Sequence, residues 1–599
     1  MRRPLVPILV AAMGVALLPL SGAAQAVTVD DTPTRLAMKG GHETGAEGQN
    51  LDKLRDAYYW SRLLAGDTPI SLEQASSLRE SASRNASGML AATTPGAARG
   101  GAWTSQGPAP IVQVMRTSNT FGAMSGRVGA LAMRRDGTIL LGAAQGGVWT
   151  YDATAQTWTS RTADADTQSV GALALAPSDD RIAYLGTGEG ALSGDSYYGD
   201  GVWRSGDGGL TWTHVSTRFV GQATSAIEVD PTNPQHLFIA TLRGRGGNHR
   251  TSAPAATPYG VYESTNGGST WALLKGTTDE LHGATDLVMD PQDPKTLWAS
   301  FWGDGIYKTV DGGKTWASAL GNLPAGNFLE GGTRFALGVS RPSAAVPPTL
   351  YAGYDYFDTA NVYHAAVIYK SRDGGTTWTN ATGAPATGIN SVKGYCGAQC
   401  FYDNVVKPDP KDPNVVYALG SYGYGNSPQS GGVFRSTDGG ATWLNLGYDL
   451  HPDFHAIAFQ PTNTKHVAIG NDGGVWQSST GGGRPAAADP LSAADWENLN
   501  GAVNPANGAL IHSTGLAITQ FVSVATVPKV PGQYWGGTQD NGTLRKSVVN
   551  SRWFDQASGD GGNVIVDQTT ANPYTTNYPA FVFGTYFGCL LYTSDAADE

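Results

Sequence analysis

The sequence predicts an all-β protein made of many short strands joined by tight turns, and composition is the first observation that predicts this. Of its 599 residues, 80 are glycine and 16 are tryptophan, while only 15% are charged. The glycine share is roughly twice the average and lacks the three-residue period of collagen. Apolar residues at 40% argue against disorder, and a glycine-rich, Lys/Glu-poor composition excludes a helical bundle. The net charge of −11, with no Lys/Arg run between aromatics, argues against nucleic-acid binding.

The second observation is a repeated pattern, S-x-D-x-G-x-T-W. Three copies match it fully and two differ at one position: Ser205–Trp212, Ser371–Trp378, Ser436–Trp443, Ser264–Trp271 and Thr309–Trp316. Successive tryptophans lie about 45–65 residues apart, which is the length of a four-stranded propeller blade. The spacing therefore predicts a β-propeller.

The chemistry of the repeat explains its residues. Asp-Gly-Gly is a hairpin turn in which glycine supplies positive φ, and the Ser and Asp side chains bond the amides of the turn. The tryptophan then fills the seam between neighbouring blades. The acids or amides of the repeat are therefore expected to be structural: Asp207, Asn266, Asp311, Asp373 and Asp438. A second unit, such as Ile227–Pro234, gives each blade the order strand A, Pro/Asn turn, strand B, variable loop, strand C, Asp turn, strand D.

We expect the chain to divide into five segments: a signal peptide (1–26), a helical extension and linker (27–100), a first propeller (101–450), further blades of a truncated second propeller (451–588), and a tail (589–599). The signal peptide has Arg2 and Arg3, an apolar stretch from Ile8 to Leu20, and an A-x-A cleavage pattern before Val27. No other apolar run approaches transmembrane length. The mature protein is thus expected to be exported from a bacterial cell, without a membrane span.

The extension and the tail differ from the propeller segments. Leu51–Leu64 and Ser71–Ser83 are expected to be helices, separated by a Gly-Asp-Thr-Pro break. Cys589–Glu599 looks like the translation of a sequencing adapter, so the natural chain is expected to be cut near Gly588. About eight blade-sized units then fit. We expect a complete seven-bladed propeller followed by part of a second, and a single propeller of eight to ten blades is the alternative.

The repeats resemble the Asp-box (BNR) repeats of sialidases, xyloglucanases and sortilin-type proteins. A wider set of motifs resembles secreted bacterial proteins described as BNR-repeat glycosyl hydrolases: Ser125–Val128, Gly186–Glu189, Asn471–Gly474, Thr538–Gly542 and Gly559–Gly562. The resemblance covers about Trp103 to Gly588 and implies a secreted, carbohydrate-active propeller. The leading hypothesis is a glycoside hydrolase acting on poly- or oligosaccharides, and the alternative is a non-catalytic, sortilin-like propeller that binds a peptide or glycan.

Strand order places the remaining candidates on the face opposite the Asp-box turns. Glycoside hydrolysis needs two carboxyl groups about 5–10 Å apart. The candidate catalytic acids are Asp472 and Asp540, with Glu189 and Asp453 as further partners. Exposed aromatic and polar residues on the same loops suit sugar binding, and the substrate-binding candidates are Arg127, Trp302, Tyr354, Tyr356 and Gln539.

Two differences from the families that this chain resembles argue against parts of the glycoside hydrolase hypothesis. Xyloglucanases place a catalytic Asp in a T-D-x-G-G segment of the first blade, where this chain has Gln145, which cannot act as a base. Sialidases hold the substrate carboxylate with an arginine triad, and Arg127 alone is not a triad. The first departure favours the binding hypothesis, and the second argues against a sialidase.

Two smaller features suggest local chemistry. His451, Asp453 and His455 would share one side of a strand at period 2, where they could hold a divalent metal, supply acid/base groups or form a hydrogen-bonded cluster. Cys396 and Cys400 are expected to form a disulfide, because export favours oxidation and a second CxxC for zinc is absent. No cofactor is required by these motifs. The expected partner is a carbohydrate or peptide ligand, and the protein is expected to be a monomer.

Overall fold

The computed structural model describes residues 105–566 and four short strands outside that range. Those strands are β1 (Leu64–Ala65), β2 (Thr68–Pro69), β40 (Phe581–Tyr586) and β41 (Tyr592–Asp595). Internal gaps fall at 114–120, 164, 166, 193–195, 244–257, 278–282, 325, 327–332, 386, 388–389, 422–431, 449, 484–494, 505–508, 528–529, 549 and 558. The chain divides into two compact units, Met1–His42 and Glu43–Glu599, and everything described here belongs to the second.

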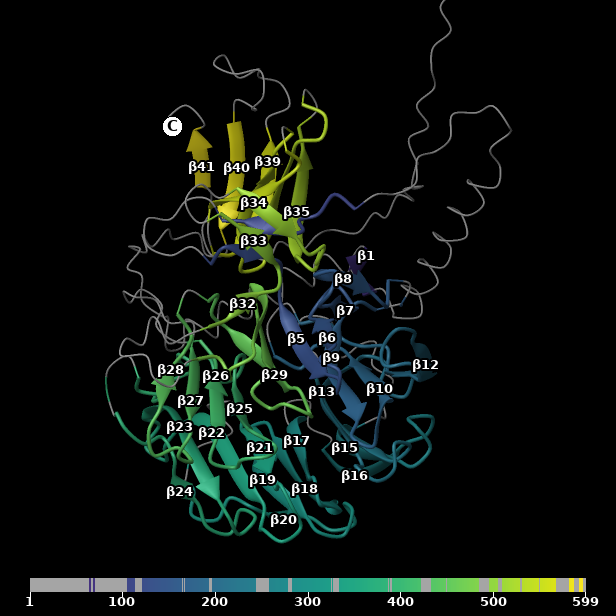
Figure 1. Ribbon diagram of the computed structural model, residues 1–599, viewed down its shortest axis with the longest axis vertical. Coiled ribbons are helices and arrows are strands. Elements are labelled where there is room, and N and C mark those ends of the chain that lie inside the picture. The colour runs from purple at the N-terminus through teal and green to yellow at the C-terminus, as the bar shows by residue number, and fades with distance from the viewer. Residues whose placement is uncertain are drawn as a thin grey trace, which may run out of the picture. The chain divides into compact units, whose positions relative to one another are not determined.

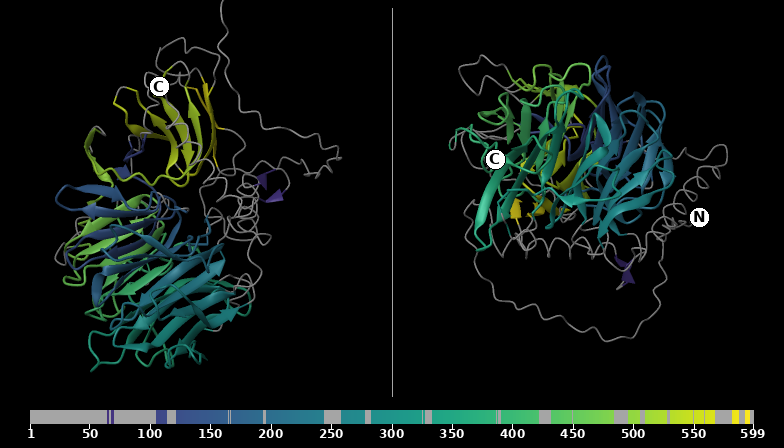
Figure 2. Two further views of the ribbon diagram at one scale, coloured as in Figure 1. Left: turned by 90° about the vertical axis from the view of Figure 1, so that its right-hand side faces the viewer. Right: turned by 90° about the horizontal axis from the view of Figure 1, so that it is seen from below.

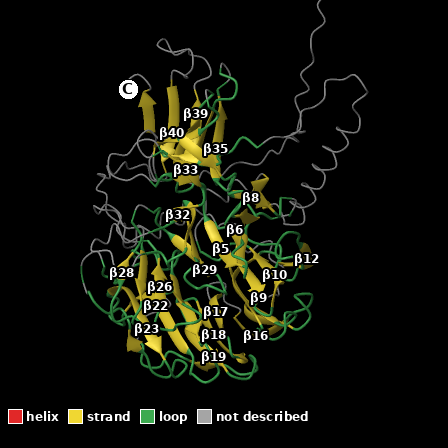
Figure 3. Ribbon diagram, viewed as in Figure 1, coloured by secondary structure: helices red, strands yellow, loops and turns green. Residues whose placement is uncertain are grey.

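Strands and loops make up all of the described residues, so no helix there could cross a membrane (Figure 3). The expected signal peptide and the expected helix at Ser71–Ser83 lie outside the described residues, and so does the helix at Leu51–Leu64 except for its last residue, which belongs to β1. The all-β class predicted from composition is confirmed.

Seven four-stranded antiparallel sheets, counted over the described residues, occupy the chain from 128 to 498 (Figure 1). The first three are β5 (Val128–Met133), β6 (Ile139–Ala143), β7 (Val148–Asp152) and β8 (Thr157–Ser160); β9 (Val170–Ala176), β10 (Asp179–Thr187), β11 (Val202–Ser205) and β12 (Thr213–Ser216); and β13 (Gln222–Val229), β14 (Leu237–Arg243), β15 (Tyr259–Ser264) and β16 (Ala272–Thr277).

The next four sheets follow the same order along the chain. They are β17 (Ala284–Asp290), β18 (Asp293–Phe301), β19 (Gly305–Thr309) and β20 (Ala317–Ser318); β21 (Ala336–Ser340), β22 (Thr349–Phe357), β23 (Tyr363–Ser371) and β24 (Thr379–Asn380); β25 (Val405–Pro408), β26 (Val416–Leu419), β27 (Val433–Ser436) and β28 (Leu444–Asn445); and β29 (Phe454–Phe459), β30 (Val467–Asn471), β31 (Gly474–Ser478) and β32 (Glu497–Asn498).

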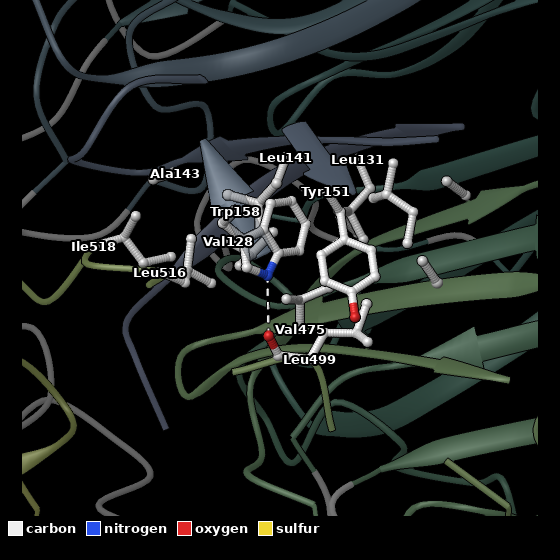
Figure 4. Packing of buried hydrophobic residues seen from close by; sticks show 14 of the residues in the cluster. Val128, Leu131, Leu141, Ala143, Tyr151, Trp158, Val475, Leu499, Leu516 and Ile518 are labelled. Atoms are coloured by element: carbon white, nitrogen blue, oxygen red, sulfur yellow. Dashed lines mark hydrogen bonds between the residues drawn. The ribbon is translucent and has the colours of Figure 1, made fainter. Parts of the chain in front are cut away.

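The first strands of these sheets contact one another in chain order, and β29 of the last sheet lies against β5 of the first. Buried apolar side chains fill this closing seam: Val128 and Leu131 of β5 pack with Val475 of β31, and the Trp158 Nε1 donates to the Leu499 carbonyl over 2.9 Å (Figure 4). The division expected at 450/451 falls just before the sheet that meets β5. We propose that the first propeller includes β29–β32 and ends near residue 498.

Besides the two-stranded sheet of β1 and β2, the remaining strands form three further sheets. A two-stranded sheet pairs β33 (Gly501–Val503) with β34 (Leu510–Ser513). A six-stranded sheet joins β35 (Phe521–Thr526), β36 (Tyr534–Thr538), β37 (Gly542–Lys546) and β38 (Trp553–Ala557) to β3 (Ile111–Val112) and β4 (Ala123–Met124), with β38 parallel to β3. The third sheet is β39 (Gly561–Val566), β40 and β41. Figure 2 shows these sheets from two other sides.

Strand β41 lies in the tail 589–599 and pairs with β40. The expected adapter origin of this tail stays a prediction.

The five Asp-Gly-Gly or Asn-Gly-Gly turns hold their polar side chains through hydrogen bonds within the turn. In the second sheet, Asp207 Oδ1 accepts from the Thr211 amide over 2.9 Å, and the Gly209 amide donates to Ser205 Oγ over 2.8 Å. Equivalent bonds occur at Asn266, Asp311, Asp373 and Asp438. These contacts support a structural role for the five residues.

The tryptophans of these turns do not all bond in the same way. Trp316 donates to Gly313 of its own turn over 3.0 Å, whereas the buried Trp378 donates over 3.0 Å to the Ala319 carbonyl, which follows β20 of the preceding sheet. Trp378 therefore joins two blades. Trp378→Ala is expected to lower the free energy of unfolding by about 3–5 kcal/mol, because it leaves a cavity in the seam. Urea unfolding measures the loss, and an equal loss for Trp316→Ala, which is only half-buried, would contradict this account.

Candidate active site

Arg127 lies at the centre of a buried cluster that brings together three separate sequence motifs. It immediately precedes β5, and 1% of its surface is exposed. Its Nη1 lies 3.0 Å from Glu189 Oε1, its Nε 3.0 Å from Asp472 Oδ1, and its Nη2 3.1 Å from Asp540 Oδ2. Each of these acids follows the second strand of a different sheet: β10, β30 and β36. One guanidinium thus gathers three loops from distant parts of the chain.

Asp472 is fully buried and surrounded by donors. Besides Arg127, His455 Nε2 lies 2.7 Å from Oδ1, and the Tyr402 hydroxyl donates to Oδ2 over 2.5 Å. Burial alone would raise the pKa of Asp472, but the charges of Arg127 and His455 and the hydrogen bond from His455 outweigh it and hold this pKa well below its usual range. Asp472 is therefore ionised and shielded, so it acts on its neighbours and cannot contact a substrate.

Asp540 differs from Asp472 in exposure and in charge. Its side chain is 22% exposed, its φ is 58°, and its amide donates to Asp560 Oδ1 over 3.1 Å. Burial raises the pKa of Asp540, the negative charges of Asp560 and Asp472 raise it further, and Arg127 offsets only part of this rise. Two neighbouring carboxyl groups whose pKa values move apart can divide acid and base roles. Asp540 is the member of the pair that keeps a proton.

The expected separation of Asp472 and Asp540 was wrong in detail. A hydrogen bond joins their carboxyl groups, which is closer than the roughly 5–10 Å needed for two groups that flank a glycosidic bond. The half-buried Asp560, from the Gly559–Gly562 motif, stands beside Asp540 instead. Glu189 is as buried as Asp472, so it too can only position its neighbours.

The expected array of His451, Asp453 and His455 does not form. Strand β29 begins only at Phe454, and the left-handed φ of 64° at Asp453 breaks the alternation that would have aligned the three side chains. His451 Nδ1 contacts the Pro452 carbonyl, whereas His455 contacts Asp472. Across the described ranges, the one group of three metal-capable side chains is Asp355, Cys396 and Cys400, and its cysteines form a disulfide.

The expected substrate-binding residues separate into two groups. Gln539 joins the cluster through an Nε2 bond of 3.1 Å to Asp540 Oδ2, and Arg127 holds carboxylates at a depth where no ligand reaches it. Tyr354 is 0% exposed within the core between two blades, so it cannot contact a ligand. Trp302 packs against Leu192, Ala223 and Leu242, which belong to two other blades, and Tyr356 stacks on His364 with ring centroids 4.6 Å apart.

Sequence reasoning missed several residues of the cluster. Asn541 Nδ2 donates to the Asp472 carbonyl over 2.9 Å, and the Arg127 guanidinium lies 5.0 Å from the centre of the Tyr402 ring. Tyr402 lies two residues after the loop closed by the Cys396–Cys400 disulfide. A loop constrained by a disulfide and ending just before β25 was the signal that could have found it. Gln145 lies between β6 and β7, in the loop that corresponds to those of Asp472 and Asp540.

Comparisons with known proteins agree with this architecture. No protein-family model matches the chain. A xyloglucanase from Paenibacillus sp is 28% identical over 227 residues, which are 35% of this chain and 20% of the relative. A xyloglucanase from Hypocrea jecorina is 25% identical over 333 residues, which are 51% of this chain and 35% of the relative. The chain thus matches about a third or less of the length of these curated relatives.

Solved structures extend the likeness over most of the chain. A GH74 xyloglucanase from Xanthomonas campestris superposes with a TM-score of 0.52 at 17% identity, over 80% of this chain and 65% of that one. A GH74 enzyme from Niastella koreensis gives 0.51 at 19% identity, over 81% and 68%. This chain has a glycoside hydrolase-like β-propeller fold. Identities this low establish the fold, and the chemistry of this propeller has to be argued from its own residues.

Proposed function

We propose that this propeller is a secreted glycoside hydrolase that cleaves a neutral poly- or oligosaccharide, with Asp540 as the proton donor. The observation that carries the proposal is the pair of unlike carboxyl groups on Arg127: Asp472 is buried among donors that lower its pKa, and Asp540 is partly exposed and has a raised pKa. The xyloglucanase relatives support the class of reaction.

The proposed reaction uses the exposed side of the cluster. The Asp540 hydroxyl gives its proton to the glycosidic oxygen as the bond to the anomeric carbon breaks. Asp560 is the second carboxyl group, and it accepts a proton from the water that attacks that carbon. Asp472 and Glu189 do not touch the substrate, and their charge, balanced by Arg127, keeps the proton on Asp540 in the free enzyme. Asp453 is left out of this step because it is buried beside Asp403.

The charge of the cluster supports a neutral substrate. Arg127 is buried and its charge is already paired with three carboxyl groups, so it cannot hold a substrate carboxylate. An anionic sugar would also meet Asp560 at the exposed side. We therefore place neutral glucans, such as xyloglucan and other β-glucans, ahead of sialylated glycans as substrates.

A non-catalytic propeller that binds a glycan or peptide is the second candidate, and Gln145 is the observation that favours it. A substrate panel separates the two. We expect reducing ends to be released from xyloglucan or another β-glucan but not from sialylated glycans, and Asp560→Asn should abolish the release. Asp412→Asn, a matched change at an exposed turn after β25, should leave it intact. Retention of a glycan or peptide on a column without any release would support the binding function instead.

The activity is expected to fall on the alkaline side as Asp540 loses its proton. The pKa of Asp540 is raised, so the protonated form persists above the usual carboxyl range and is lost as the pH rises through that raised pKa. A kcat profile against pH measures this decline. The residual activity of Asp540→Asn should decline less steeply with rising pH than that of the wild type, and an unchanged alkaline decline in that variant would contradict the assignment.

A further inference from the structure

A second pair of carboxyl groups lies behind the first. Asp403 lies two residues before β25 and Asp453 immediately precedes β29, so they come from adjacent blades whose first strands are in contact. Asp403 is 0% exposed and Asp453 is buried as well. A hydrogen bond links the two carboxyl groups, and Gln399 Nε2 lies 3.4 Å from Asp453 Oδ1.

The buried carboxyl group of Asp403 has few partners that could stabilise a negative charge. Apart from Asp453 and its own backbone amide, no group in the described part of the chain forms a hydrogen bond with its carboxyl oxygens. The nearby Arg334 donates its Nη1 to the Tyr402 carbonyl over 2.7 Å and divides its charge between Asp286 and Asp403. Two buried carboxylates in contact repel each other strongly, and retaining one proton turns that repulsion into a hydrogen bond.

We propose that Asp403 and Asp453 hold one proton between them and form a clamp that joins the starts of β25 and β29. The two donors that fix Asp472 stand next to this clamp: Tyr402 precedes Asp403 in the chain, and His455 follows two residues after Asp453. The proton therefore keeps both donors aimed at Asp472. Asp403 and Asp453 are positioning residues, and this role in activity rests on the proposed function.

The electrostatic surroundings agree with a retained proton. Burial raises the pKa of Asp403 well above its usual range, and the charges of Asp453 and Asp472 add to the rise. The titratable or charged groups that face the pair from the elements packed around it are Arg334, Tyr395, Tyr402, His451, His455 and Asp472.

Thermal melting against pH tests the clamp without any substrate. The folded state binds a proton that the unfolded chain releases, so the clamp loses stability as the pH rises from the ordinary carboxyl pKa toward the raised one. Asp403→Asn replaces the shared proton with an amide donor at every pH. We expect its Tm to match that of the wild type near about pH 5 and to exceed it increasingly toward about pH 9. Asp453→Asn should flatten the curve in the same way, whereas Asp412→Asn should not.

The results that would contradict the shared proton differ from those that would contradict the proposed function. Parallel melting curves for the wild type and both clamp variants, or the same Tm loss at every pH, would overturn the shared proton. The alkaline decline of kcat in the wild type should be steeper than the loss of one proton allows. In Asp403→Asn the decline should have the slope expected for the loss of the Asp540 proton alone. A flattened melting curve in a protein that hydrolyses nothing would refute the proposed function and leave the clamp standing.

Discussion

Asp540→Asn is expected to lower kcat on a neutral polysaccharide by roughly 10²–10⁴-fold, the usual contribution of a positioned general acid. The amide keeps the size of the side chain and can still accept from Arg127, but it has no acidic proton for the leaving oxygen. The raised pKa of Asp540 and its 22% side-chain exposure single it out among the acids on Arg127. Reducing-end assays with the purified variant measure the loss.

Leaving-group chemistry gives this prediction its control. An aryl glycoside with an acidic phenol needs little protonation, so its cleavage by Asp540→Asn should be impaired far less than cleavage of the polymer. Asp412→Asn should match the wild type on both substrates. An equal loss on both substrates, with an unchanged melting temperature, would mean that Asp540 binds the sugar and does not protonate it.

Arg127→Met should lower the free energy of unfolding by about 3–5 kcal/mol near neutral pH, because it leaves buried Asp472 and Glu189 without their counter-charge. In the wild type, the depressed pKa of Asp472 contributes stability that is present above the unfolded carboxyl pKa and is lost as the pH falls through the folded one. The difference between the variant and the wild type should therefore shrink as the solution is acidified. Denaturant unfolding at several pH values measures it.

Arg435 offers a matched buried arginine. Its Nη1 donates to the Gly481 carbonyl over 2.6 Å, and its other partners include the Thr480 carbonyl and the Tyr417 hydroxyl. Arg435→Met removes hydrogen bonds without stranding a carboxylate, so its cost should be smaller and should not depend on pH in the acidic range. If both variants behaved alike, Arg127 would be an ordinary packing residue and not the hub of the site.

The fold could be predicted because its signals are local. Each Asp-Gly-Gly turn carries its own hydrogen bonds, as Asp207 shows with the Thr211 amide, so the pattern is readable from a few consecutive residues. The spacing of the tryptophans then gives the size of a blade. The closing contact between β29 and β5 depends on packing between residues more than 300 positions apart, such as Trp158 with Leu499, and no local pattern reports it.

The candidate site was predicted as a set of residues but not as an arrangement. Glu189, Asp472 and Asp540 were all selected from loops on one face, and Arg127 was misjudged as a sugar-binding residue. A sequence gives no sign that one guanidinium will bind three acids. Tyr354 was assigned to the exposed face because its strand was expected to end earlier, whereas β22 continues to Phe357 and buries it. The clamp of Asp403 and Asp453 depends on contact between two blades, which composition and spacing do not encode.

The most direct test of the central claim compares turnover and binding on one oligosaccharide. Nuclear magnetic resonance would follow a xyloglucan oligosaccharide incubated with the wild type and with Asp540→Asn. The account predicts new anomeric signals of reducing ends with the wild type, and with the variant an intact oligosaccharide whose resonances still broaden on binding. Broadening without new reducing ends in both proteins would contradict it and would make this propeller a glycan-binding protein.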